Sequence, residues 1–458
     1  EGTEFPLQKY VPSKETDYRK GFMAYGGDFG YKGVPSDDNF CCNGLISSDR
    51  TPHPCMGHVK FCQQPIKTRL VSLEDGILTV NVENRHDFID LSNFKLRWRV
   101  TNLSEPVAVE LPNLKAGEKA NLMIDLKAVI QKARYVTLEY TLANDTPYAK
   151  AGTVVAWDQF KVRDFGAPTF TVKTDAQAQE TDDAYRLSAN GVEFTFCKKT
   201  GNMVSWKKND TELLASPMKP NFWRAPTDND RGNNEPNRCG IWKNAGNSWK
   251  IDTVSFADGV LTFTGTLPEV QAKLVMKYSQ DEKGRLLVTM DYQHVGENQL
   301  PEMPRFGVYF TLVEGFENFK WCGRGPAETY WDRKNGEMFG HWKSTVTDNF
   351  FPYSEPQETG NHIDTYMLMF DGVAKFAVFG QKGYDGQPWF SFNALHYSLD
   401  ALQTAKHAFQ MPESKETFVN IDYLQTGVGG DDSWGAHPHE QFKLKAKEYH
   451  FEFMLDTK

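Results

Sequence analysis

Long apolar runs are missing from this chain of 458 residues. No stretch approaches the roughly 18–20 apolar residues of a membrane helix, so the sequence predicts no membrane-spanning segment and no membrane partner. A basic surplus is also missing: the net charge is −9, which argues against a nucleic-acid partner. Residues 1–5 contain neither an initiator Met nor a basic segment followed by an apolar one. This excludes a signal peptide and predicts a chain processed or cut from a longer one.

Cysteine is scarce, and no paired C-x-x-C spacing suggests a zinc site. The seven cysteines are Cys41, Cys42, Cys55, Cys62, Cys197, Cys239 and Cys322. We expect mostly free, buried thiols, which is typical of a reducing compartment. The predicted location is the cytoplasm, with the periplasm as the alternative.

Long helical periods and internal repeats are missing as well, whereas alternation of apolar and polar residues is frequent. From about Lys67, seven short strands in roughly 100 residues predict an immunoglobulin-like sandwich, which we interpret as a spacer. Residues 165–168 read as a linker. Beyond it, one large antiparallel sandwich is predicted from strands near 192–196, 260–265, 273–278, 286–292, 306–312, 376–379, 418–423 and 449–455.

Helices are expected in only two places. Asp49 to Pro54 reads as a helix start, and Met56, Val59 and Phe61 then give a short apolar stripe. The second candidate covers residues 398–405. Residues 1–24 are polar and without apolar periodicity, so they predict a loop or a frayed end, and a Gly-rich loop with one carboxylate follows.

One loop mixes glycines, carboxylates and an aromatic ring. Residues 427–435 hold four glycines, the adjacent Asp431 and Asp432, and Trp434. Carboxylates suit the hydroxyl edge of a sugar and an aromatic ring suits its C–H face. The alternative is a Gly-rich hairpin whose Asp side chains cap their own backbone.

Three further polar stretches leave alternatives open. Residues 221–232 carry alternating acids that suit calcium, or form an ordered surface loop tied by Arg–Asp pairs. Residues 321–330 read as a strand followed by a tight turn, because the spacing and lysine of a phosphate loop are absent. Within residues 356–362, Glu358 and His362 are an acid–base pair or a surface hydrogen bond. Among 60 acids, nothing local selects the two carboxylates that a glycoside hydrolase needs.

As a set, these motifs resemble β-galactosidases of glycoside hydrolase family 2. The resemblance rests on Tyr25-Gly26-Gly27-Asp28-Phe29-Gly30, Asp38-Asn39-Phe40-Cys41-Cys42-Asn43-Gly44-Leu45, Asp49-Arg50-Thr51-Pro52-His53-Pro54, Arg224-Ala225-Pro226-Thr227-Asp228-Asn229-Asp230, Gly323-Arg324-Gly325-Pro326 with Glu328-Thr329-Tyr330, and Gly429-Gly430-Asp431-Asp432-Ser433-Trp434. It implies a mostly β fold. Residues 1–64 would be the C-terminal remnant of a (β/α)8 barrel. Residues 65–165 would be the immunoglobulin-like β-sandwich, and residues 166–458 the large galactose-mutarotase-like sandwich of the small-chain domain.

The resemblance also implies site residues. The family's catalytic glutamates lie earlier in the barrel, so no catalytic residue is expected here. The Phe40 carbonyl and Asn43 match positions that bind sodium, Asn43 also faces the sugar, and Trp434 matches an aromatic platform for galactose. Ser36 stands where the family can have an Asn near magnesium. Sodium and magnesium are thus expected in the complete enzyme, with at most a partial sodium site in this chain.

The implied function is the C-terminal part of a retaining β-galactosidase acting on terminal β-D-galactosides such as lactose, inactive alone. Its partners would be the galactoside, the upstream catalytic domains or a large subunit, and further copies in a homo-oligomer. One alternative is a natural non-catalytic small subunit. Another is an independent carbohydrate-binding or mutarotase-like module, which needs a His–Glu pair in the large sandwich. The histidines available for that pair are His362, His396, His437 and His439.

Overall fold

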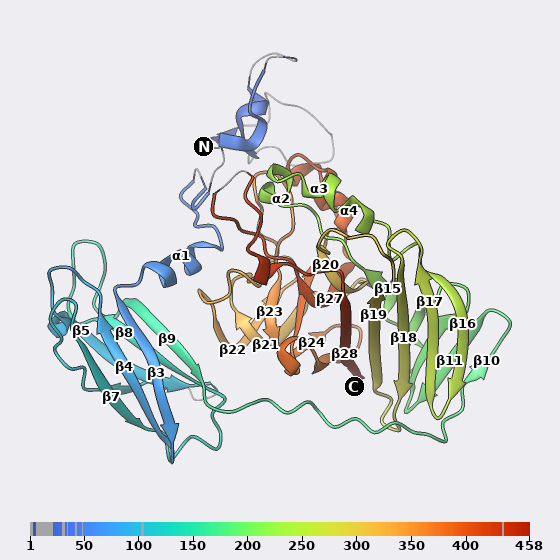
Figure 1. Cartoon of the computed structure of the whole chain (residues 1–458), viewed down its shortest axis with the longest axis horizontal. Helices are drawn as coiled ribbons and strands as arrows, with labels where there is room; N and C mark the ends of the chain where they lie inside the picture. The colour runs from blue at the N-terminus through green and yellow to red at the C-terminus, as the bar shows by residue number, and fades with distance from the viewer. Residues whose placement is uncertain are drawn as a thin grey trace. The chain divides into compact units, whose positions relative to one another are not determined.

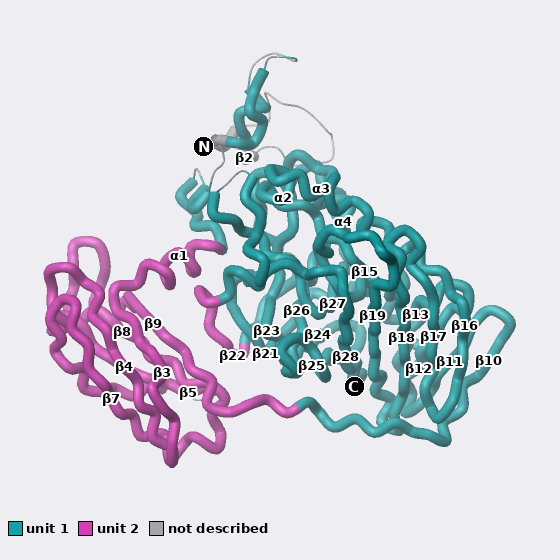
Figure 2. The backbone as a smooth tube through the Cα atoms, in the orientation of Figure 1, with its two compact units in different colours: residues 1–54, 167–334, 342–458 teal, residues 55–166, 335–341 magenta. Residues whose placement is uncertain are grey.

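The computed structural model describes residues 3–5, 22–29, 33, 35–41, 44–47, 49–101, 105–432 and 435–458. Two compact units are distinguished in Figure 2. One contains residues 55–166 and 335–341, and the other residues 1–54, 167–334 and 342–458. Both are built from antiparallel sheets, so the predicted mostly β fold is confirmed. None of the described helices is long and apolar enough to cross a membrane.

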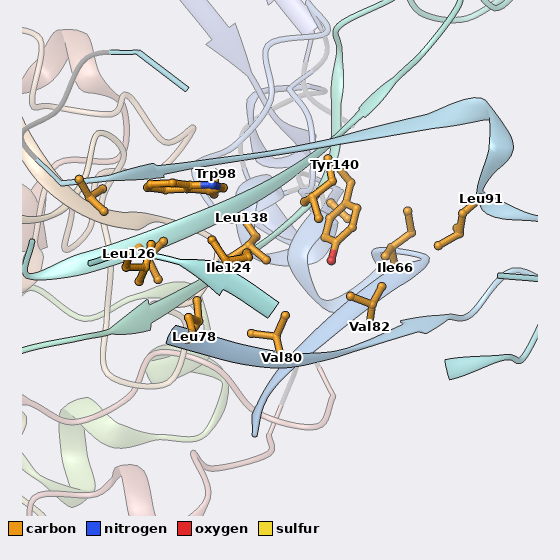
Figure 3. Close-up of a cluster of buried hydrophobic side chains, with 14 of the residues drawn as sticks. Ile66, Leu78, Val80, Val82, Leu91, Trp98, Ile124, Leu126, Leu138 and Tyr140 are labelled. Atoms are coloured by element: carbon orange, nitrogen blue, oxygen red, sulfur yellow. The ribbon is translucent and has the colours of Figure 1, made fainter. Parts of the chain in front are cut away.

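The smaller unit is a sandwich of three plus four strands, as expected for an immunoglobulin-like domain. One sheet has the order β3 (Ile66–Glu74), β4 (Ile77–Asn84), β7 (Lys119–Asp125), and the other β6 (Val107–Val109), β5 (Phe94–Val100), β8 (Tyr135–Leu142), β9 (Val154–Lys161). Alternate residues of β4 are buried, which is the period-two pattern of a half-buried strand. Figure 3 shows these side chains meeting those of the facing sheet, with Val80, Val82, Trp98 and Leu138 among them.

The larger unit contains two extensive sheets (Figure 1). The first has the order β10 (Gln179–Glu180), β11 (Ala184–Ala189), β12 (Val192–Cys197), β13 (Met203–Lys208), β15 (Leu214–Asn221), β20 (Arg305–Leu312), β27 (Thr417–Gln425), β26 (Phe390–Leu395), β23 (His362–Thr365), with β14 (Thr211–Glu212) paired to β13. The second has the order β16 (Lys250–Ala257), β17 (Val260–Leu267), β18 (Ala272–Gln280), β19 (Leu286–His294), β28 (Glu448–Thr457), β25 (Lys375–Lys382), β24 (Met367–Asp371), β21 (Asn318–Gly325), β22 (Met338–Thr345). This is the predicted large antiparallel sandwich.

Aromatic contacts join the two sheets of the larger unit. Phe196 on β12 lies 4.2 Å from Tyr278 on β18, measured between ring centroids. Phe306 on β20 lies 5.2 Å from Tyr449 on β28. The faces that carry these rings therefore form the apolar interior of the sandwich.

The opposite face of the first sheet is polar and largely buried. Lys219 on β15 pairs with Tyr309 on β20, Tyr309 with Asn420 on β27, and Asn420 with Asn393 on β26. Directly paired residues share a face of a sheet, so these side chains form one polar row. Asn393 and Asn420 are buried. Loops therefore cover this face, which the alternation in the sequence alone would assign to solvent.

Helices are short in the part of the chain that the structure describes. Those named α are α1 (Met56–Gln63), α2 (Asp228–Gly232), α3 (Glu235–Arg238) and α4 (Leu399–Thr404). Both predicted helices are confirmed, and Ser398 caps α4 by accepting the Ala401 N–H at 3.1 Å. The proposed start of α1 is wrong in detail, because Asp49 lies seven residues before Met56 and accepts the Thr51 N–H instead of capping the helix.

Two further expectations are corrected. Residues 1–24 were expected to form a loop or a frayed end, but β1 (Thr3–Phe5) pairs antiparallel with β2 (Phe22–Ala24), while residues 6–21 lie outside the described residues. The five described cysteines outside residues 41–42 form no disulfide with one another, but only Cys239 and Cys322 of these five are buried, and Cys62 is exposed.

Candidate functional site

Three of the sequence motifs meet in one cluster of loops on the larger unit. Its anchor is Arg224, whose guanidinium donates to both carboxylate oxygens of Asp230 at 2.8 and 3.0 Å. The same side chain donates to the Thr426 carbonyl and, at 3.0 Å, to the Gly427 carbonyl. Because the Arg224 and Asp230 side chains are 1% and 3% exposed, this paired charge fixes the glycine-rich loop to residues 224–230.

The glycine-rich loop is also held by Asp332, just after the Glu328–Tyr330 motif. Its carboxylate accepts the Gly429 N–H at 2.7 Å. A Cβ at Gly427 would lie 2.6 Å from the same carboxylate, so this approach requires glycine. Within the loop, Asp432 accepts the Ala436 N–H at 3.2 Å, as the alternative of a self-capping hairpin predicts. The loop is therefore capped internally and fixed from outside.

The predicted Arg–Asp tie within residues 221–232 is confirmed, but its placement on the surface is wrong. Arg224 is buried, because its guanidinium reaches across to the 426–427 backbone. Among the described residues, no group of three or more His, Cys, Asp or Glu side chains could hold a metal ion, so the calcium interpretation gains no support.

Residues 22–29 contact the same unit through an aromatic pair. The Tyr25 ring stacks on the His407 imidazole with centroids 4.7 Å apart and planes 7° apart. His407 Nε2 lies 2.8 Å from an oxygen of Asp28, and the Tyr25 hydroxyl donates to the Lys406 carbonyl at 2.9 Å. Burial, with nearby Glu355, raises the pKa of Tyr25 well above its ordinary value, so this hydroxyl remains a donor.

Helix α2 connects two of the predicted substrate-facing segments. Asn39, in the 3-10 turn Asp38–Cys41, donates to the Asp228 carboxylate at 2.9 Å. The next residue of the helix, Asn229, donates to the Val428 carbonyl at 2.9 Å. Consecutive residues therefore hold the turn that contains Phe40 and the loop that leads to Trp434.

The predicted site residues are only partly within the described chain. Phe40 lies in that turn with its side chain 40% exposed. Asn43 and Trp434 lie outside the described residues, so their roles stay predictions. Ser36 Oγ accepts the Asp38 N–H at 3.3 Å. Carbonyl and amide oxygens such as those of Phe40 and Asn43 are the donor type that a hard cation prefers, so the predicted partial sodium site fits the available chemistry.

The predicted pairing of Glu358 with His362 does not form. Both side chains are buried, which also corrects the expectation of a surface hydrogen bond. His362 Nε2 lies 2.8 Å from the Asn349 amide oxygen, and burial lowers the pKa of His362 to about 3. Glu358 instead accepts from Arg305 at 2.9 Å.

The other candidate histidines have separate acidic partners. His396 pairs with Glu317 at 2.6 Å, His437 with Glu302 at 4.0 Å, and His439 with Asp431 at 2.8 Å. The four histidines are therefore not brought together in one sugar-facing pocket of the large sandwich.

Sequence reasoning missed the residues that position this cluster. His407 and Asp332 stand outside the quoted motifs, and isolated His and Asp residues give no local signal. Asp228 and Asn229 belong to a quoted motif, but their partners lie about 190 and 200 residues away. Only the folded chain reveals these contacts.

Comparison with known proteins gives consistent matches along the chain. The family described as "Beta galactosidase small chain" matches residues 188–455. "Beta-galactosidase, domain 4" matches residues 80–163, and "Glycosyl hydrolases family 2, TIM barrel domain" matches residues 7–68. The last match supports the predicted barrel remnant.

Two relatives illustrate the extent of this similarity. The Beta-galactosidase of Priestia megaterium is 34% identical over 440 residues, covering 93% of this chain and 41% of that protein. The Beta-galactosidase of Streptococcus thermophilus is 30% identical over 452 residues, covering 95% and 42%. The chain thus spans about two fifths of these relatives. A solved putative mutarotase from Salmonella typhimurium has a TM-score of 0.35 at 12% identity, covering 64% of this chain and 96% of that one, a likeness too weak to support the assignment.

Proposed function

Because this chain belongs to the β-galactosidases of glycoside hydrolase family 2, we propose that it forms the C-terminal part of a retaining β-galactosidase. The complete enzyme would hydrolyse terminal β-D-galactosides such as lactose. The relatives are more than twice as long as the segment they share with this chain, so the catalytic domains would be supplied by other polypeptide.

The observation that carries this proposal is the double attachment to α2. Asp228 holds the turn with Phe40, and Asn229 holds the loop that leads to Trp434. The turn that contains a predicted sodium ligand and the loop that leads to the predicted galactose platform are therefore fixed to adjacent residues of one helix. Such preorganisation suits a wall of a substrate pocket, since a site must hold its groups in place before the substrate binds.

The chemistry itself would lie elsewhere in the complete enzyme. Retaining hydrolysis needs one glutamate to attack the anomeric carbon and another to exchange a proton. This chain would contribute stacking through Trp434 and a hydroxyl contact through Asn43. The Phe40 carbonyl and Asn43 would supply some of the ligands of a sodium ion. The charge of that ion would orient a galactose hydroxyl. Magnesium would be held mainly by residues outside this chain.

Replacing Trp434 with alanine in the complete enzyme should raise KM for a chromogenic β-galactoside about tenfold, with a smaller change in kcat. A stacking platform binds substrate and transition state alike, so its loss appears chiefly in KM. Steady-state kinetics test this. The exposed Tyr148→Ala on the smaller unit is the matched control and should leave KM unchanged. An unaltered KM in Trp434→Ala would refute the assigned role.

The complete protein would act as a homo-oligomer in the cytoplasm, with the galactoside and the upstream domains as its partners. A natural non-catalytic small subunit is the second form of the same proposal, with the catalytic domains on a separate chain.

An independent mutarotase-like module would need a converging His–Glu pair. Among the four candidate histidines, His396 has the shortest contact to a glutamate, at 2.6 Å from Glu317. Following sugar anomerisation by NMR would test it.

A further inference from the structure

A pocket of about 280 Å³ opens on the polar face of the first sheet in the larger unit. Its floor includes Lys219 and Tyr309, which are directly paired on β15 and β20. Trp223 lines it after the end of β15, and Asp400 and Gln403 line it from α4. This volume is close to the lower limit of about 300 Å³ for small-molecule sites, so one sugar ring fits it.

The walls of this pocket are fixed by internal contacts. The Trp223 indole donates to Gln403 at 3.1 Å, and Gln403 donates to Asp400 at 3.0 Å. Burial raises the pKa of the Tyr309 hydroxyl to about 12, and the nearby Leu399 backbone opposes this rise. On the other side, a Cβ at Gly246 would lie 2.1 Å from the Pro220 carbonyl, so this loop packs directly against β15.

Lys219 is the unusual group of the pocket. Its ammonium donates to the Asn247 amide oxygen at 2.9 Å. Burial lowers the pKa of Lys219, and no carboxylate among the described residues forms an ion pair with it. A second lysine, Lys243, stands exposed at the rim, and Asp400 is the single acid of the lining. A half-buried cation without an acidic partner favours an anionic ligand.

We propose that this pocket binds a sugar ring that carries one anionic group, either a carboxylate or a phosphate. Lys219 and Lys243 pair with the anion, and the Asp400 carboxylate and the Gln403 amide bind ring hydroxyls. The half-buried Tyr309 ring contacts the apolar C–H face, and the edge of the buried Trp223 closes the wall beside it. The ligand-binding role does not depend on the proposed galactosidase activity, because none of the described residues that line the pocket has a role in the proposed hydrolysis.

Saturation-transfer NMR on the purified chain, titrated with galacturonate, galactose 6-phosphate or galactose, tests this site. We expect a Kd of about 1 mM or tighter for one of the anionic sugars and at least tenfold weaker binding of galactose. Galacturonate and galactose 6-phosphate distinguish a carboxylate from a phosphate. Galactose binding as tightly as both anionic sugars would overturn the proposal.

Two substitutions locate the binding. Lys219→Met should weaken it at least tenfold, and Asn247→Asp should do the same by placing a carboxylate beside the ammonium. Since Asn247 is exposed, the second variant should fold even if the first does not. Lys273→Met removes an exposed lysine on β18 and should bind normally, as should Trp434→Ala. Binding lost in Trp434→Ala but kept in Asn247→Asp would contradict this location.

Discussion

Replacing Arg305 with methionine should lower the free energy of unfolding by about 3–5 kcal/mol. Arg305 donates to Glu358 at 2.9 Å, and its Nε lies 3.1 Å from an oxygen of Asp422. All three side chains are 0% exposed. Methionine would leave two buried carboxylates facing each other without a cation.

Burying the Asp422 carboxyl in this network is energetically unfavourable. Burial, with Glu358 nearby, raises the pKa of Asp422 well above its ordinary value, and Arg305 opposes this rise. Neither carboxylate oxygen of Asp422 has a hydrogen-bond partner among the described residues. The attraction of Arg305 is therefore the main compensation for burying this carboxylate.

Urea unfolding followed by circular dichroism measures this loss. Arg186→Met is a matched control, because Arg186 pairs with Glu193 on the same sheet but is 44% exposed, and it should change stability by less than about 1 kcal/mol. Adding Asp422→Asn to Arg305→Met should recover at least about 1 kcal/mol, because asparagine neither carries a charge nor must take up a proton when it is buried. Equal losses for Arg305→Met and Arg186→Met would contradict the account.

Replacing Glu235 with glutamine should stabilise the protein above pH 8 by about 3–5 kcal/mol. Burial, reinforced by Asp230, raises the pKa of Glu235 to about 8 from its ordinary 4.5. Neither of its carboxylate oxygens has a hydrogen-bond partner among the described residues. The folded protein thus keeps a proton that the unfolded chain releases.

The direction of the pH dependence follows from this difference. Stability due to the protonated carboxyl is fully present below about pH 4.5 and is lost as the pH rises towards 8. Glutamine has nearly the same shape and does not titrate. Melting temperatures of the two proteins between pH 5 and pH 9 should therefore diverge as the pH rises, with the variant higher. Parallel curves would show that Glu235 is ionised in the folded state.

Apolar alternation in the sequence predicted many of the longer strands, including β4, β8, β19 and β20, because one face of each packs on an apolar core. β15 was missed because it contains Pro217 and Pro220, which remove ladder donors. Register shifts between Leu214 and Lys219 accommodate these prolines. The distortion depends on pairing with β20, so it has no local signature.

The buried polar face could not be predicted from alternation. The pattern of Asn420 and Asp422 on β27 looks like a solvent-facing row, and residues 356–362 look like a surface loop. In the folded chain, Asn393 donates to Glu358 at 2.9 Å and Asn420 donates to Asn393 at 2.7 Å, so loop and strands bury each other. Alternation of apolar and polar residues distinguishes the two faces of a sheet, but it does not indicate which parts of the chain cover each face. The candidate site was indicated by its motifs, whereas the contacts that hold it are long-range.

The most direct test of the proposed function is hydrolysis of a chromogenic β-galactoside by the purified chain, alone and after mixing with the upstream portion of a family β-galactosidase. We predict no hydrolysis by the chain alone, because the catalytic glutamates would lie on the other polypeptide, and activity that appears only in the mixture. Hydrolysis by the chain alone would contradict this account, since it would require a catalytic carboxylate pair within these 458 residues.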